Sequence, residues 1–217
     1  MSDLNKLIKH LRTDFELLYL DKKKVGKDPI VQFKQWMENA LEAKTLEPNA
    51  MTLATVNKKG QPDARIVLLR SVDKNGFSFF TNYKSAKGAE IAGNKKVCLN
   101  FFWAELARQV RILGTIEKLS AKASDEYFQS RPRESQVSAW ASNQSDKIEN
   151  RQVLDEKFAE YDKQFSGKKI PRPPHWGGYV VNPISIEFWQ GRANRLHDRI
   201  LFEKGSTGKW KISRLSP

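Results

Sequence analysis

Basic and aromatic side chains gather in the segment Trp189–Arg199, near the carboxyl end of the chain. Its basic members are Arg192, Arg195, His197 and Arg199, and only Asp198 offsets their charge. Like charges this close repel one another unless an anion offsets them. If the segment is a strand, Arg195, His197 and Arg199 alternate and share one face. We therefore predict a site for a small anionic molecule here. The alternative is an exposed basic strand with His197 as a bystander.

Two more clusters could supply ligands for a phosphate. An alternating strand over Arg65–Arg70 would present its two arginines on opposite faces, and taken alone it is better interpreted as an amphipathic strand with charged ends. Farther along, Ser85 is suited to cap a helix that carries Lys87 in its first turn. Free backbone N–H groups together with a lysine favour an anion site there over a plain capped helix.

One more cluster, Tyr127–Ser135, combines a tyrosine, two arginines and serine hydroxyls, and Gln144 and Ser145 follow it. Arginine binds phosphate through two parallel hydrogen bonds, so this composition suits a phosphate. It equally suits the carboxyl end of a helix, where cations are favourable. Both interpretations stay open from the residues alone.

Turn signals and hydrophobic periodicity predict the elements that position these clusters. Residues 1–27 are expected to form a flexible arm, and residues 28–217 a single domain with 174–217 as its C-terminal segment. Helices are predicted after Asp28, from Ser85 to Gly93, from Ser120 to Gln129 and over Arg151–Phe165. Strands are predicted over Ala50–Val56, Ala64–Arg70, Phe77–Thr81, Lys96–Trp103, Arg108–Leu119, Tyr179–Val181, Ile184–Trp189, Ile200–Glu203 and Trp210–Ile212. Such closely spaced strands predict a mainly β, antiparallel barrel or sandwich with helices on its outside.

The composition narrows the function classes. Of the 217 residues, 39% are hydrophobic and 29% charged. No apolar run approaches the roughly 18 residues of a membrane helix, and the N-terminus lacks the pattern of a signal peptide, so a soluble cytoplasmic protein is expected. The lone cysteine, Cys98, is predicted to be a buried core residue. No zinc spacing, Gly-rich phosphate loop or Gly-x-Ser-x-Gly elbow is present, which disfavours metal and hydrolase chemistry. The net charge of +13 admits nucleic acid, a membrane surface or phosphorylated small molecules.

Several motifs in a fixed order carry a family resemblance, from about Asp28 to Pro217. They are Arg65–Leu69, Phe80–Asn82, Arg108–Val110, Tyr127–Gln136, Phe188–Arg199 and Arg214–Pro217. In these segments the sequence resembles the pyridoxine (pyridoxamine) 5′-phosphate oxidases. The resemblance implies an antiparallel, Greek-key split β-barrel that works as a homodimer, with FMN bound between the subunits. It also implies oxidation of pyridoxine or pyridoxamine 5′-phosphate to pyridoxal 5′-phosphate. Hydride would pass from C4′ to flavin N5, and O2 would reoxidise the flavin and give H2O2.

The resemblance also assigns roles to residues. Flavin contacts fall on Arg65, Ile66, Val67, Leu68, Leu69, Arg70, Phe80, Thr81, Lys87, Gln109, Gln144, Ser145, Trp189 and Arg199. Arg70, Tyr127, Arg131 and Ser135 are expected to bind the substrate phosphate. Arg195 and His197 are the expected catalytic pair over the pyridine ring, orienting the substrate and handling the proton of its hydroxyl or amine. Arg199 is a candidate to stabilise the negative charge of reduced flavin.

Two alternatives remain. One is a related split-barrel flavoprotein with another substrate, such as a flavin reductase or an oxidase of secondary metabolism. The Tyr127–Ser135 segment argues against it because that segment suits a substrate phosphate. The other is a basic nucleic-acid-binding module, which the charge alone suggests and which would be colourless and salt-sensitive. We expect neither nucleic acid nor membrane as a partner, and no metal.

This chain departs from the family pattern at two cationic positions. Arg70 stands where lysine is common, and Ala86 stands where arginine is common, so one contact to the flavin phosphate is missing. We predict that Ala86→Arg binds FMN more tightly than the natural sequence. Titration of FMN into both apoproteins measures the difference, and equal affinities would contradict the prediction.

Overall fold

The computed structural model describes residues 8, 19–23 and 25–217. Most of the predicted arm, residues 1–27, therefore lies outside the described residues. Backbone contacts divide the chain into two compact units. Unit 1 contains the chain up to Pro48 together with Phe102–Arg111 and Ser185–Pro217, and unit 2 contains Asn49–Phe101 and Ile112–Ile184.

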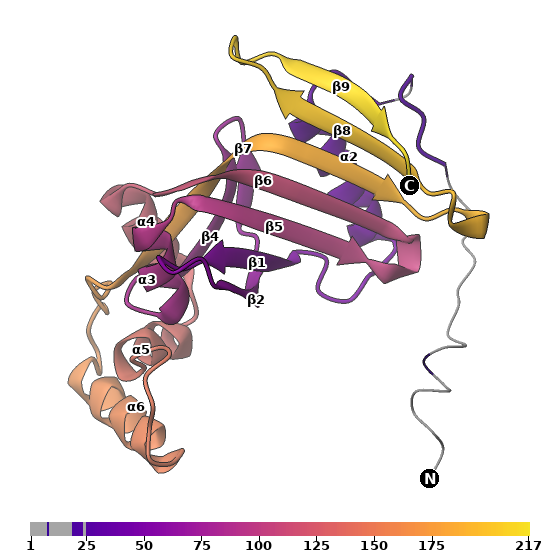
Figure 1. The fold of residues 1–217 in the computed structure, drawn as a ribbon. Coiled ribbons are helices and arrows are strands. Elements are labelled where there is room, and N and C mark those ends of the chain that lie inside the picture. Colours follow the sequence, from indigo (N-terminus) through magenta and orange to yellow (C-terminus); the bar gives the residue numbers. More distant parts are fainter. Residues whose placement is uncertain (1–7, 9–18, 24) are drawn as a thin grey trace. The chain divides into compact units, whose positions relative to one another are not determined.

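Nine strands and five α-helices make up the described chain (Figure 1). The strands are β1 (Ala50–Val56), β2 (Pro62–Leu68), β3 (Ser71–Asp73), β4 (Gly76–Asn82), β5 (Lys96–Trp103), β6 (Arg108–Lys118), β7 (Trp176–Gln190), β8 (Asp198–Lys204) and β9 (Trp210–Leu215). The α-helices are α2 (Pro29–Glu42), α3 (Ala86–Gly93), α4 (Ala121–Ser130), α5 (Arg133–Ala141) and α6 (Gln152–Gln164). Two short 3-10 turns cover Ala104–Leu106 and Ala193–Arg195. None of the helices that the structure describes is long and apolar enough to cross a membrane.

The strands hydrogen-bond in the order β2-β1-β5-β6-β7-β4-β3, with β8 beside β7 and β9 beside β8. The pairs β1–β2, β1–β5, β3–β4, β4–β7, β7–β8 and β8–β9 are antiparallel. Along β6 the burial alternates over most of its length, so one face packs inward and the other is exposed. This arrangement agrees with the predicted antiparallel β architecture with peripheral helices.

The core of unit 1 forms where α2 packs on the end of β7. The helix begins as its sequence predicts, because the side chain of Asp28 accepts a hydrogen bond from the Ile30 N–H and Pro29 occupies the first turn. Trp36 of α2 meets Phe188 edge-on, with ring centroids 5.1 Å apart. Phe188 in turn lies 5.7 Å from Phe202 of β8, and both phenylalanines are fully buried.

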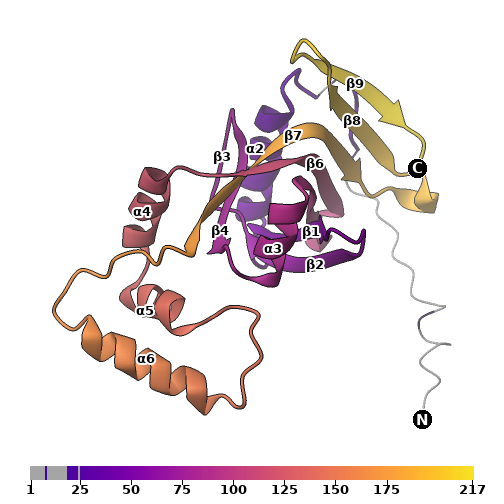
Figure 2. The same cartoon turned by 60° about the vertical axis from the view of Figure 1, so that its left-hand side comes forward.

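In unit 2, α5 and α6 pack against each other (Figure 2). Trp140 of α5 lies beside Tyr161 of α6 and beside Phe165, which follows that helix. A buried cluster joins these helices to Phe128 of α4 and Trp176 at the start of β7. The helices α4, α5 and α6 are therefore tied to the sheet through aromatic side chains.

Several boundaries differ from those predicted. The strand predicted over Ala64–Arg70 runs instead from Pro62 to Leu68, because the chain turns there to begin β3. The two strands predicted over Tyr179–Val181 and Ile184–Trp189 are one strand, β7, which continues through Pro183. Cys98 is half-buried rather than buried, because it lies on the outward-alternating face of β5.

The helix α5 was not predicted. Its first turn follows Pro132, which provides no side-chain cap, and its nine residues, Arg133–Ala141, carry few large apolar side chains. Helix periodicity is weak in so short and polar a segment, so tertiary packing decides its structure. By contrast, β1 and β5 match their predicted bounds, and Ser85 and Ser120 cap α3 and α4 as predicted.

The buried aromatic contact in unit 1 gives a test of stability. Phe188→Ala leaves a cavity between Trp36 and Phe202, and we expect it to lower the free energy of unfolding by about 3–5 kcal/mol. Val31→Ala on the exposed side of α2 is the control, with an expected change within about 0.5 kcal/mol. Denaturant titration of both variants measures the two changes, and a similar loss in each would contradict this assignment of the core.

Candidate active site

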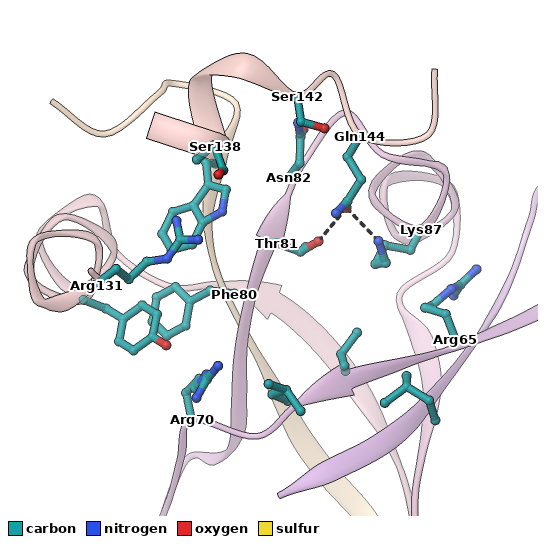
Figure 3. A pocket seen from close by; sticks show the side chains of 16 residues that line it. Arg65, Arg70, Phe80, Thr81, Asn82, Lys87, Arg131, Ser138, Ser142 and Gln144 are labelled. Carbon is teal, nitrogen blue, oxygen red and sulfur yellow. Dashed lines mark hydrogen bonds between the residues drawn. The ribbon is translucent and has the colours of Figure 1, made fainter. Parts of the chain in front are cut away.

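A cavity of about 660 Å³ opens in unit 2. It is lined by Arg65, Ile66, Val67, Leu68, Arg70, Phe80, Thr81, Asn82, Lys87, Tyr127, Arg131, Ser138, Ala139, Ser142, Gln144 and Trp176. Figure 3 shows Arg70 and Arg131 on one side of this cavity and Arg65 and Lys87 on the other. We call these two sides the Arg70–Arg131 end and the Arg65–Lys87 end.

At the Arg65–Lys87 end, the strand β4 leads into the helix α3. Ser85 caps this helix by accepting from the Gly88 N–H, and the side chain of Ser145 accepts from the Ala86 N–H at 3.2 Å. Lys87 is buried and donates to Gln144 Oε1 at 2.8 Å, and Thr81 donates to the same oxygen at 3.1 Å. The lysine predicted to hold a phosphate is thus fixed at a helix N-terminus.

Burial lowers the pKa of Lys87, and the positive charge of Arg65 acts in the same direction. Glu90 and Asp63 oppose this change because their carboxylates favour the charged amine. A negatively charged ligand beside Lys87 would likewise favour the charged form. The Arg65–Lys87 end therefore combines two cations with acidic neighbours.

At the Arg70–Arg131 end, three aromatic rings lie nearly parallel. Phe80 stacks on Tyr127 with centroids 3.8 Å apart and on Trp176 with centroids 5.5 Å apart. Gly178 allows this packing, since a Cβ there would lie 2.8 Å from Phe80 Cε1. The guanidinium of Arg131 lies over the Trp176 ring at 4.6 Å, so it is held by a cation–π contact.

Arg131 is unusual among the lining residues because its charged side chain is largely buried and incompletely hydrogen-bonded. Its Nη1 atom is buried and has no hydrogen-bond partner. Burial lowers the pKa of Arg131, and the nearby charge of Arg70 acts in the same direction. Among the residues that the structure describes, neither arginine forms an ion pair with a carboxylate. A buried cation with an unused donor is stabilised when an anion binds it.

Five of the predicted site residues lie in unit 1: Gln109, Trp189, Arg195, His197 and Arg199. Arg199 of β8 donates through Nε to Glu187 Oε1 at 2.7 Å and through Nη1 to the carbonyl of Ser216 at 2.9 Å. Arg111 of β6 pairs with the other oxygen of the same carboxylate. Glu187 is buried, which alone would raise its pKa, but the hydrogen bond from Arg199 and the charge of Arg111 lower it below its usual value.

Arg195 and His197 do not share a strand face with Arg199, contrary to prediction. Arg195 ends the 3-10 turn Ala193–Arg195, and β8 begins only at Asp198. Asn194 and Arg195 both have left-handed backbones, with φ of 56° and 59°. Such conformations are costly for residues other than glycine and concentrate at functional sites. Alternation fails because this turn interrupts the strand.

His197 is nevertheless held in a defined orientation. Its Nδ1 accepts the backbone N–H of Arg192 at 3.1 Å, which leaves the ring proton on Nε2. The ring lies 4.7 Å from that of Trp189. The Nε2 atom is therefore the ring nitrogen that this hydrogen bond leaves available.

The cavity thus brings together most of the residues predicted in unit 2. The predicted residues outside its lining are Leu69, Gln109, Ser135, Ser145, Trp189, Arg195, His197 and Arg199. Leu69 is buried and donates its N–H to the carbonyl of Asn49. Gln109 is a half-buried residue of β6, and Ser135 is a half-buried residue in the first turn of α5.

Sequence reasoning did not assign five lining residues to the site: Asn82, Ser138, Ala139, Ser142 and Trp176. Three of them lie on α5 or directly after it, so the missed helix concealed them. Asn82 belongs to the Phe80–Asn82 motif, but the family resemblance assigns it no role. Trp176 sits at the start of β7, a position that the predicted strand boundaries excluded.

Comparison with known proteins places the chain in a family. Residues 37–165 match the family model described as pyridoxamine 5′-phosphate oxidase, and residues 176–217 match the pyridoxine 5′-phosphate oxidase C-terminal dimerisation region. The chain belongs to the pyridoxamine 5′-phosphate oxidase family. The resemblance inferred from its motifs is thereby confirmed.

Two relatives named pyridoxine/pyridoxamine 5′-phosphate oxidase illustrate the similarity. The protein from Nostoc punctiforme is 52% identical over 214 residues, which are 99% of this chain and 100% of the relative. The protein from Cupriavidus necator is 53% identical over 207 residues, which are 95% of this chain and 97% of the relative.

Solved structures share the fold. PhzG from Burkholderia lata, crystallised with tetrahydrophenazine-1-carboxylic acid, superposes with a TM-score of 0.88 at 30% identity, covering 94% of this chain and 100% of that one. A pyridoxamine 5′-phosphate oxidase-related, FMN binding protein from Nostoc punctiforme has a TM-score of 0.70 at 15% identity, covering 89% of this chain and 100% of that one. These neighbours confirm the predicted fold class, a split β-barrel with peripheral helices.

The two arginines on Glu187 make a prediction about pH. Because the folded pKa of this carboxyl is lowered, its stabilisation is present above the ordinary value of 4.5 and is lost as the pH falls through the folded value. Glu187→Gln should lower the free energy of unfolding by about 1.5–3 kcal/mol at pH 7. The difference in unfolding free energy between Glu187→Gln and the natural sequence should become smaller below pH 4.5.

Denaturant titrations from neutral to acidic pH measure this gap. Glu203→Gln, an exposed change on the same hairpin, is the matched control and should show little difference at any pH. A gap for Glu187→Gln that stays constant with pH would show that the ion pairs do not contribute as described.

Proposed function

We propose that the protein is an FMN-dependent oxidase that converts pyridoxine 5′-phosphate and pyridoxamine 5′-phosphate to pyridoxal 5′-phosphate. The observation that carries this proposal is the buried, unpartnered Nη1 of Arg131, a residue that lines the cavity together with a second cation, Arg70. A phosphate dianion can accept a hydrogen bond from the unused donor and can neutralise the two cations, since it offers negative charge and several acceptor oxygens. The family to which the chain belongs is named for substrates that carry such a phosphate.

The residues of the cavity fit FMN as well. A flavin needs an anion site for its phosphate and a wide slot for its ring system, and a cavity of about 660 Å³ with two separate cationic ends provides both. Lys87, Arg65 and Thr81 would hold the flavin phosphate, and the backbone of Ile66–Leu69 would border the ring system. When bound, FMN would accept a hydride from the substrate's C4′ carbon and pass the electrons to O2, which gives H2O2.

The substrate phosphate is assigned to the Arg70–Arg131 end, with Tyr127 and Ser135 as further ligands. The parallel rings of Phe80, Tyr127 and Trp176 restrict the side-chain positions there, so the substrate is oriented before reaction. His197 carries its proton on Nε2 and is assigned to proton exchange with the substrate's hydroxyl or amine. Arg195, which ends the 3-10 turn with a left-handed backbone, is assigned to orienting the pyridine ring.

We further propose a homodimer with FMN at the subunit interface. Residues 174–217 would form its dimerisation and active-site segment, which the match of residues 176–217 to a dimerisation region supports. Gln109, Trp189 and Arg199 would be flavin contacts contributed by this arrangement. The ion pair with Glu187 would limit the positive charge that Arg199 offers to the flavin.

Anaerobic reduction tests the proposed function. The purified protein should be yellow, and pyridoxine 5′-phosphate added without oxygen should bleach the flavin absorbance, whereas unphosphorylated pyridoxine should need a far higher concentration. Arg131→Met should raise the half-bleaching concentration at least about tenfold, because it removes a charged hydrogen-bond donor. Arg133→Met, an exposed change two positions away that breaks a pair with Asp162, should leave it unchanged.

In the same assay, Arg195→Ala and His197→Ala should retain the flavin but bleach more slowly. Normal rates in both variants would refute their catalytic assignment. A colourless protein that takes up no FMN, or one bleached equally by pyridoxine and its phosphate, would refute the function itself. The second outcome would favour a substrate without phosphate, such as the tetrahydrophenazine bound to the PhzG structure.

A further inference from the structure

The Arg65–Lys87 end contains two carboxylates as well as two cations. Arg65 donates through Nη2 to Asp63 Oδ2 at 2.6 Å and to Glu90 Oε2 at 2.9 Å. Its Nη1 donates to the hydroxyl of Thr55, and that hydroxyl donates to the same oxygen of Glu90. Both terminal nitrogens of the arginine are therefore already engaged by groups of this chain.

These contacts are built into the local structure. Asp63 and Thr55 face each other across β1 and β2, and Arg65 follows two positions along β2. Glu90 lies on α3, three residues after Lys87, so the two side chains are neighbours on the helix. The Arg65 and Glu90 side chains are 18% and 14% exposed, which separates this ion pair from an ordinary surface pair.

The two ends of the cavity consequently differ. At the Arg70–Arg131 end the cations lack carboxylate partners, and Arg131 keeps an unused donor. At the Arg65–Lys87 end, two positive charges face two negative ones, and Ala86 adds no further cation. An incoming phosphate at this end must share Arg65 with a largely buried carboxylate that repels it.

We propose that Glu90, assisted by Asp63, is a built-in counterion for Arg65 that competes with the flavin phosphate and so lowers the affinity of the protein for FMN. This inference rests on the proposed function, because it assumes that the phosphate at this end belongs to FMN. The carboxylates keep Arg65 ordered and neutralised while no cofactor is bound. The same contacts must weaken or rearrange when the phosphate arrives, and that cost appears in the dissociation constant.

The test compares FMN with riboflavin, the same ring system without the phosphate. Apoprotein is titrated with each flavin, and binding is followed by quenching of flavin fluorescence. Glu90→Gln keeps an acceptor for Arg65 and Thr55 but removes the charge, so FMN should bind about three- to tenfold more tightly. Riboflavin affinity should not change.

Two further variants complete the test. Asp63→Asn should act in the same direction but less strongly, since the Asp63 side chain is 53% exposed, and it keeps the proposal testable if Glu90→Gln fails to fold. Glu160→Gln, on the exposed face of α6, removes the same charge at a distance and should leave both affinities unchanged.

The outcomes separate this inference from the proposed function. Unchanged or weaker FMN binding by Glu90→Gln and Asp63→Asn would overturn it, because the carboxylates would then only position Arg65. An equal gain for FMN and riboflavin would also overturn it, since the effect would not involve the phosphate. If the natural sequence binds no FMN at all, it is the proposed function that fails, and the inference fails with it.

Discussion

Positive charge that must be neutralised is the constraint on which this structure depends. Arginine and lysine are among the costliest side chains to bury, yet Lys87, Arg108 and much of Arg131 are withdrawn from water. The protein resolves this cost in two ways. Glu187 neutralises Arg111 and Arg199, and Glu90 neutralises Arg65, whereas Arg131 lies over the Trp176 ring near the like charge of Arg70 and has no carboxylate partner among the described residues. The last solution is incomplete without a ligand.

The contrast between arginines paired with carboxylates and the unpaired Arg131 also concerns the choice of ligand. The PhzG structure shares the fold closely at 30% identity, and its crystallised ligand is a carboxylic acid rather than a phosphate ester. A fold alone therefore does not determine the ligand. In the present chain, the local feature on which the proposed choice of a phosphate rests is Arg70 beside Arg131, whose Nη1 has no partner.

Sequence reasoning succeeded where local physics dominates. Asp28 and Ser85 cap their helices as expected because a cap needs only its own side chain and the next turn. The cations of the cavity were also found, since motif order located them. What failed depends on distant packing: α5 has little periodicity of its own, and the turn at Arg195 needs a left-handed backbone that alternation does not reveal. The carboxylates Glu90 and Glu187 escaped notice because nothing nearby in sequence marks them as partners of an arginine.

One strand, β7, carries residues of both groups of functional side chains. Near its start, Trp176 and Gly178 pair with Asn82 and Phe80 beside the cavity, and near its end Trp189 pairs with Arg199. Side chains alternate along a strand, so inserting or deleting a single residue within β7 would turn one of these groups to the opposite face. Loops such as that between α6 and β7 can change length with little thermodynamic penalty. The length of β7 is therefore a quantity that evolution cannot vary in steps of one.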